Sequence, residues 1–121
     1  MPAPSSSRRR QAERSGRAAE VVAAVLLTIK GYRLLTTRFK AAVGEIDIVA
    51  RRGGTLVFVE VKLRKTTEEA RLAVTTTNQR RIKAAADAYL ARRASRTDLP
   101  LRYDIIAMSP YSINHIRDAF R

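Results

Sequence analysis

The chain has 121 residues, which is enough for one domain with a modest core. Its 24 Lys and Arg residues against 11 Asp and Glu give a net charge of +13, which indicates a polyanionic partner, nucleic acid first and an anionic membrane surface second. The absence of cysteine excludes disulfides and thiolate metal sites, and a single histidine excludes a His-rich zinc site within one chain. No apolar run reaches the roughly 18 to 20 residues of a membrane helix. We therefore expect a cytoplasmic protein that does not span a membrane.

Residues 1–15 are predicted to form a disordered basic arm, because they contain prolines, serines and arginines without hydrophobic periodicity. The four arginines of this arm less Glu13 contribute +3, so +10 remains on a single folded domain predicted for residues 16–121. The argument for a nucleic-acid partner therefore does not depend on the arm.

Residues 17–30 are predicted to form a helix that is buried on most sides and ends before Gly31, a favourable C-terminal capping residue. Glu20 interrupts the apolar run of this helix. It is either a first-turn carboxylate that the helix dipole favours or an acidic group directed at a functional site. A first strand is expected at residues 32–39.

The stretch from residue 44 to 62 indicates a β-hairpin. Two runs rich in Ile and Val flank the dipeptide Gly53-Gly54, and two glycines between β-type runs are typical of a tight turn. If Arg52 also belonged to the loop, the pairing would slip by one residue and the side chains would change faces.

The predicted register brings two acidic residues together, since Asp47 faces Glu60. On the same face, Glu45 lies opposite Lys62. Like charges whose Cβ atoms are roughly 4.5 to 5.5 Å apart destabilise a hairpin. A divalent cation would account for the acidic pair, because Mg²⁺ takes hard oxygen ligands, often one or two carboxylates. Lys62 could then hold an attacking water or offset charge on a scissile phosphate.

The alternative is a solvated hairpin face on which Glu45 and Lys62 form a surface ion pair. The neighbouring residues favour a functional site. In the hairpin strand that follows Gly53-Gly54, alternate valines make one face apolar, and Leu56 and Phe58 make much of the other face apolar. This pattern is typical of a strand that is covered on both sides.

Two motifs in this hairpin carry a family resemblance: GEID at residues 44–47 and FVEVK at residues 58–62, followed by Arg64. The sequence resembles the YraN family of small bacterial proteins at these residues. That family is placed in the restriction-endonuclease-like superfamily, near archaeal Holliday-junction resolvases, through its PD-(D/E)xK nuclease motif. The resemblance also covers Gly16, Glu20, the basic helix near residues 78–93 and the closing segment 113–120.

The resemblance implies a Mg²⁺- or Mn²⁺-dependent nuclease. Asp47 takes the place of the motif's Asp, Glu60 that of its acidic residue and Lys62 that of its Lys. Glu20 would be a further metal ligand, and Glu45 would support the acidic cluster. The sequence departs from the family pattern, since Asn78 stands where a Lys is common.

Residues 78–93 are predicted to form a helix packed on one side, because apolar residues recur at helical spacing. Three basic residues crowd its first turns, where the helix dipole disfavours cations and a phosphate ligand would reverse that penalty. Gln79 is either an exposed amide or a residue that reaches the site, as the resemblance implies. The candidate nucleic-acid-binding residues are Arg64, Gln79, Arg80, Arg81 and Lys83.

The rest of the chain completes an α/β domain. Residues 64–74 are expected to be a polar surface loop, or a mobile loop over a substrate. Residues 101–108 alternate as a strand, and residues 111–116 give a short edge strand. The order α-β-β-β-α-β-β predicts a mixed β-sheet with helices on both faces, in which the second helix crosses over to a parallel strand. This order fits the restriction-endonuclease-like core that the resemblance implies.

Three polar residues of the last strands are assigned no function. Asp104 and Arg102 share one face of their strand, and a surface ion pair is the simplest account. His115 is expected to be an ordinary residue on the surface of a strand.

The leading hypothesis is a metal-dependent DNA endonuclease that acts on branched or structured DNA, where a homodimer would cut two strands symmetrically. The alternative is a catalytically silent nucleic-acid-binding protein of the same fold within a DNA repair or processing complex. A third class is an interaction protein that docks on acidic proteins or lipid through its arm. The +10 charge outside the arm argues against the third class.

Overall fold

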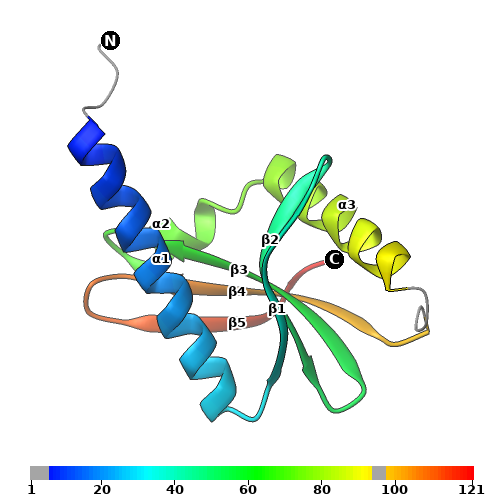
Figure 1. The fold of residues 1–121 in the computed structure, drawn as a ribbon. Helices are drawn as coiled ribbons and strands as arrows, with labels where there is room; N and C mark the ends of the chain where they lie inside the picture. The colour runs from blue at the N-terminus through cyan, green and yellow to red at the C-terminus, as the bar shows by residue number, and fades with distance from the viewer. Residues whose placement is uncertain (1–5, 94–97) are drawn as a thin grey trace.

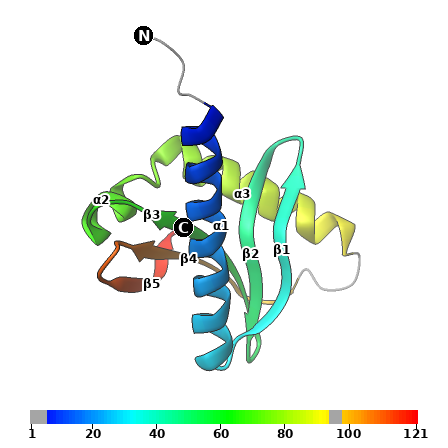
Figure 2. The same ribbon diagram turned by 60° about the vertical axis from the view of Figure 1, so that its left-hand side comes forward.

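The computed structural model of the protein describes residues 6–93 and 98–121. This part of the chain forms a five-stranded sheet with a helical layer on each face, as Figure 1 and Figure 2 show. The strands are β1 (Arg33–Ala41), β2 (Gly44–Arg52), β3 (Thr55–Leu63), β4 (Leu101–Met108) and β5 (Ile113–Phe120). The helices are α1 (Ser6–Ile29), α2 (Thr67–Leu72) and α3 (Thr76–Arg92).

The strand order in the sheet is β1-β2-β3-β4-β5. β3 and β4 are parallel and the other neighbours are antiparallel, so the predicted mixed sheet and its crossover are confirmed. The core is divided by the sheet into two clusters. One lies between the sheet and α1, and the other lies between the sheet and the helices α2 and α3. The side chains of β3 alternate between these clusters, so both faces of this strand are covered as its sequence indicates.

Helix α1 begins at Ser6 and not near Arg17, so residues 6–15 of the expected arm are part of this helix. Residues 1–5 of that arm lie outside the described residues. The first turns of α1 extend past the edge of the sheet (Figure 1). The helix ends as predicted, because Gly31 has a φ of 89°, a conformation that glycine adopts without steric cost. No helix in the described part of the chain is long and apolar enough to cross a membrane.

The connection expected at residues 64–74 contains the short helix α2, which the sequence analysis missed. Thr66 caps it, since its side chain accepts a hydrogen bond of 3.0 Å from the backbone N–H of Glu69. Glu68 and Glu69 occupy its first turn, where the helix dipole favours carboxylates. A helix of six residues is too short to show a hydrophobic period, so its capping residue was the available signal.

The hairpin of β2 and β3 has the predicted register, with Ile48 opposite Val59 and Arg52 opposite Thr55. The ladder ends at Ile48 and Val59, so Asp47 and Glu60 lie just beyond its last pair. The continuation of β2 pairs with β1 instead, where Glu45 faces Lys40 and not Lys62. The two strands of the predicted hairpin therefore part where its acidic residues lie.

A kink in β1 and β2 accompanies this separation. Arg38 has a φ of 54°, which is unusual for a residue other than glycine, and its flanking pairs place it opposite Asp47. On β2, Ile46 packs in the cluster beside α3, whereas Ile48 packs in the cluster beside α1. Strict alternation is thus broken around Asp47, and such irregularities turn a side chain out of its regular direction.

A buried ionic network replaces the surface pair and the surface histidine that we expected on β4 and β5. The Asp104 side chain is fully buried, and the His115 side chain is only 4% exposed. Asp104 accepts two hydrogen bonds of 2.8 Å from Arg102 and one of 3.0 Å from the backbone N–H of Asp118. Burial alone would raise the pKa of Asp104, but hydrogen bonds from His115, Arg102 and that N–H lower it to about 2.

His115 links this carboxylate to the end of α1. Its Nε2 lies 2.8 Å from Asp104, and its Nδ1 lies 2.5 Å from the Lys30 ammonium. Because an ammonium has no acceptor, Nδ1 accepts the hydrogen bond and the Nε2–H donates to the carboxylate. Arg102 also donates to the hydroxyl of Tyr32 over 2.5 Å. The network therefore ties the C-terminal end of α1 to β4 and β5.

Candidate active site

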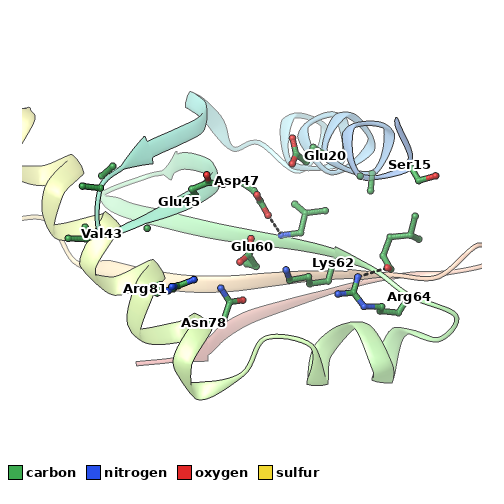
Figure 3. Close-up of a pocket in the computed structure, with 17 residues that line it drawn as sticks. Ser15, Glu20, Val43, Glu45, Asp47, Glu60, Lys62, Arg64, Asn78 and Arg81 are labelled. Carbon is green, nitrogen blue, oxygen red and sulfur yellow. Dashed lines mark hydrogen bonds between the residues drawn. The ribbon is translucent and has the colours of Figure 1, made fainter. Parts of the chain in front are cut away.

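A cavity of about 750 Å³ opens where β2 separates from β3, between the middle of α1 and the first turns of α3 (Figure 3). It contains most of the side chains that the sequence analysis assigned to a site. The charged residues that line it are Glu20, Glu45, Asp47, Glu60, Lys62, Arg64 and Arg81.

Asp47 is fixed in this cavity by a hydrogen bond to the backbone of the neighbouring strand. Its Oδ2 accepts from the N–H of Val61 over 2.8 Å (Figure 3). The carboxylate thus takes the place of a backbone acceptor beyond the end of the ladder. Asp47 is half-buried, and this hydrogen bond holds its side chain against β3, the strand that carries Glu60.

Glu60 is the most buried acidic residue of the cavity, with 7% of its surface exposed. Burial raises its pKa from 4.5 to about 9, and a hydrogen bond with Asp47 and the charge of Asp47 act in the same direction. The charge of Lys62 and a hydrogen bond from Asn78 oppose the rise. Without a cation, the raised pKa of Glu60 favours its protonated form at neutral pH.

Replacing Glu60 by Gln is expected to stabilise the cation-free protein at alkaline pH. The folded state binds the Glu60 proton more tightly than the unfolded state, so stability falls as the pH rises from 4.5 to about 9. Gln has a similar shape and does not ionise. Denaturant unfolding in EDTA should show a gain over the wild type that grows by a few kcal/mol between pH 5 and pH 8.5.

Glu69→Gln is the matched control, because Glu69 is exposed on α2. This substitution also removes one carboxylate, but from the surface. Its stability should follow that of the wild type at both pH values. Parallel pH profiles for wild type and Glu60→Gln would show that Glu60 is ionised in the folded protein.

The other two predicted acidic residues lie at the border of the cavity. Glu45 is exposed on β2. Glu20 lies on α1, and its Oε2 forms an ion pair of 2.9 Å with Nε of Arg38. Figure 3 shows its carboxylate apart from that of Glu60. The structure therefore brings Glu20 to the cavity but pairs it with an arginine rather than with the other acids.

Two predicted basic residues follow Glu60 on the same edge of the sheet. Lys62 is half-buried and lies two residues further along β3, so both side chains face the cavity. Arg64 is exposed just past the end of the strand, where its guanidinium donates to the backbone oxygen of Leu63 over 2.8 Å. Its position leaves it accessible to a phosphate group in the cavity.

The opposite wall is made by α3 and the turn between β1 and β2. A Cβ atom added to Gly44 would lie 2.4 Å from the backbone oxygen of Arg81, so only glycine allows this approach. This contact explains the glycine of the GEID motif. The exposed side chain of Arg81, one of the candidate nucleic-acid-binding residues, lines the cavity.

Asn78 is a cavity residue that the sequence analysis did not assign. It lies three residues before Arg81 and so shares that face of α3. Its side-chain oxygen is buried, and no group in the described residues donates a hydrogen bond to it. The helical spacing from Arg81 was the signal that could have identified it.

The remaining candidates on α3 lie away from the cavity. Gln79 donates from its side chain to the backbone oxygen of Val74 over 3.2 Å, which fixes the start of the helix. Lys83 bonds to the backbone oxygen of Arg121 and lies over the ring of Phe120 at 6.0 Å. Arg80 is exposed on the helix and does not line the cavity.

The carboxylate oxygens of the cavity suit a hard cation such as Mg²⁺ or Mn²⁺ that takes only a few of its ligands from the protein. Within residues 6–93 and 98–121, no group of three or more acidic or histidine side chains could hold a metal ion. Asp47 and Glu60 are two carboxylates, and Mg²⁺ usually binds through one or two of them while waters and phosphates complete its shell. A cation would also offset the repulsion between these two carboxylates, so the two residues fit such an ion.

Comparison with known proteins identifies the family that the motifs indicated. The model of the uncharacterised protein family UPF0102 matches residues 19–108. A UPF0102 protein of Rhizobium johnstonii is 50% identical over 113 residues, which cover 93% of each chain. A UPF0102 protein of Rhizobium meliloti is 46% identical, and the match covers 94% of each chain. A UPF0102 protein of a Chelativorans species is 51% identical over 84% of this chain and 82% of its own.

Proposed function

We propose that this chain, which belongs to the uncharacterised protein family UPF0102, is a metal-dependent DNA endonuclease that hydrolyses phosphodiester bonds in branched or structured DNA. The observation that carries the proposal is the pair formed by the half-buried Asp47 and the buried Glu60 beside Lys62 in an open cavity. A fold does not retain a buried acidic pair for stability, because each carboxylate disfavours ionisation of the other.

Each side chain has a separate task in this proposal. Asp47 and Glu60 would hold a Mg²⁺ or Mn²⁺ ion, which when bound withdraws charge from the oxygens of the scissile phosphate. The ammonium of Lys62 orients an attacking water or stabilises the charge that develops on the phosphate. Arg64 and Arg81 lie on opposite sides of the cavity and bind the flanking phosphates.

The net charge of +13 supports a polyanionic substrate, since the cavity belongs to a small and strongly basic domain. Glu20 and Glu45 border the same cavity and would support the acidic pair. Glu20 can act as a further cation ligand only if its side chain leaves Arg38.

The test is cleavage of labelled four-way-junction, flap and linear DNA by the purified protein with Mg²⁺, with Mn²⁺ and in EDTA. The wild type should cut with either cation and be inactive in EDTA. Asp47→Ala should reduce cutting to background, because it removes a cation ligand and the bond that positions it. Asp87→Ala is the matched control, since Asp87 is an exposed carboxylate of α3 outside the cavity.

Cutting by Asp47→Ala at the rate of the wild type would refute the assignment, because the cleavage would then come from another site or a contaminant. Comparison of the three substrates would identify the preferred DNA structure. The same samples would report cation binding, since Mn²⁺ should raise the melting temperature of the wild type more than that of Asp47→Ala.

A second candidate is a catalytically silent DNA-binding protein with the same basic cavity. It is favoured by the pairing of Glu20 with Arg38, which leaves two acidic residues rather than three near the proposed cation. This function predicts salt-sensitive binding of DNA in EDTA and no cleavage with any cation.

A further inference from the structure

A second hollow of about 670 Å³ lies beside the candidate site, between α1 and the turn that joins β4 to β5. The turn is the orange loop at the left of Figure 1. The two cavities share Ser15, Ala19 and Leu63 in their linings, so they adjoin one another beside α1. We call this second cavity the Tyr111 hollow, after the exposed tyrosine that lines it.

The Tyr111 hollow is apolar and uncharged, in contrast to the candidate site. None of the residues that line it carries a charge. Tyr111 is 96% exposed, and Val22 and Ile113 are 44% and 45% exposed. A strongly basic chain thus presents an apolar surface directly beside a cavity that holds Lys62 and Arg64.

The backbone that carries Tyr111 is held in place by a hydrogen-bonded turn. The hydroxyl of Ser109 accepts from the N–H groups of Tyr111 and Ser112 over 3.2 and 3.0 Å. The N–H of Ser109 donates to the backbone oxygen of Ser112 over 2.9 Å. A fixed backbone lowers the entropy that an aromatic ring loses when a ligand stacks on it.

We propose that the Tyr111 hollow binds an unstacked nucleobase of the DNA strand whose phosphates lie in the candidate site. The faces of a base are flat and apolar, so they stack on aromatic rings and need no charged partner. Because the two cavities adjoin, one strand can place its phosphates beside Lys62 and Arg64 and a neighbouring base beside Tyr111. A phosphate group would instead require the charges that this hollow lacks.

The proposal rests on the proposed function in that it places DNA in the candidate site, and it names the kind of DNA. In a continuous duplex each base is covered by its neighbours, so its face is not available to Tyr111. A single strand, a flap or a branch point provides such a base. The hollow therefore selects DNA with unpaired nucleotides near the scissile bond.

The chain contains no tryptophan, so Tyr111→Trp introduces a single fluorescent reporter. The full chain would be titrated in EDTA, where no cleavage occurs, with a short single strand, the blunt duplex of the same sequence and an abasic strand of the same length. The single strand should quench and shift the emission of the new tryptophan. The blunt duplex and the abasic strand should bind through their phosphates without this change. Equal signals for all three would refute the proposal.

Ile29→Trp is the matched control, because Ile29 is 78% exposed at the other end of α1 and lines neither cavity. Its emission should not respond to the single strand. In binding assays, Tyr111→Ala should weaken single-strand binding about tenfold, whereas Tyr111→Phe should keep it. Blunt-duplex binding should be the same for both. An equal loss on both substrates, or no loss, would contradict base stacking.

These measurements do not depend on catalysis. A chain that binds an unpaired base in EDTA can still cut nothing, in which case the proposed function fails and this inference stands. A chain that cuts DNA while Tyr111→Trp gives no base-dependent signal would show the reverse.

Discussion

Lys62→Ala is expected to reduce the rate of DNA cleavage by about 10²- to 10³-fold while leaving cation binding nearly unchanged. Lys62 faces the cavity from the same strand as Glu60, and its charge acts to lower the pKa of that residue. A positive charge at this place acts mainly on the transition state, in which negative charge gathers on the phosphate. Because Lys62 is not a cation ligand, its removal separates the chemical step from cation binding.

The measurement compares single-turnover cleavage with the rise in melting temperature that Mn²⁺ causes. Asp47→Ala should lose both, whereas Lys62→Ala should lose cleavage and keep the thermal shift. Lys65→Ala is the matched control, since Lys65 is an exposed lysine that does not line the cavity. If Lys62→Ala cuts as fast as Lys65→Ala, Lys62 has no part in the reaction.

Asp104→Ala is expected to destabilise the fold by about 3 to 5 kcal/mol, because it removes one member of a buried ionic network. Its carboxylate is fully buried and accepts hydrogen bonds from Arg102, His115 and the N–H of Asp118. Without it, the buried His115 and the largely buried Arg102 lose their acceptor. Denaturant unfolding monitored by circular dichroism would measure the loss.

The control is Glu68→Ala, which breaks a solvent-exposed ion pair with Arg71 and should leave the stability close to that of the wild type. The pH dependence provides a second test. The pKa of Asp104 is lowered from 3.8 to about 2, so its contribution is complete above pH 3.8 and is lost as the pH falls toward 2. Asp104→Asn should lack this acid-induced loss. A stability equal to that of Glu68→Ala would show that the network does not stabilise the fold.

The centre of the candidate site could be predicted because short-range rules determine it. The two glycines at residues 53 and 54 fixed the hairpin register, which the structure confirms from Ile48 and Val59 to the turn. Alternation in β3 then placed Glu60 and Lys62 in one cavity. Asp47 lines the same cavity, although the ladder between β2 and β3 ends one residue away at Ile48. The periodicity of the hairpin sequence cannot predict this separation, because it depends on the pairing of β2 with a third strand, β1.

The features that sequence reasoning missed depend on contacts between distant segments. Charged residues usually lie on the surface, so a strand with Asp104 and Arg102 suggested a surface pair. Their burial depends on Lys30, Tyr32 and His115, which come from the end of α1 and from β5. Which face of a helix points into a cavity also depends on contacts between distant segments. Asn78 lines the cavity and Gln79 does not, because of the way α3 packs on the sheet.

The contact between Gly44 and Arg81 is made by backbone atoms on the α3 side. The spacing between the tip of the β1–β2 turn and α3 is therefore set by the thickness of two main chains and not by the size of any side chain. Exchange of neighbouring residues can alter the charge or polarity of the opening without changing its width. The width of the cavity opening and the chemistry of its lining can thus vary independently. Gly44 keeps the width constant, while substitutions at neighbouring positions change the chemistry.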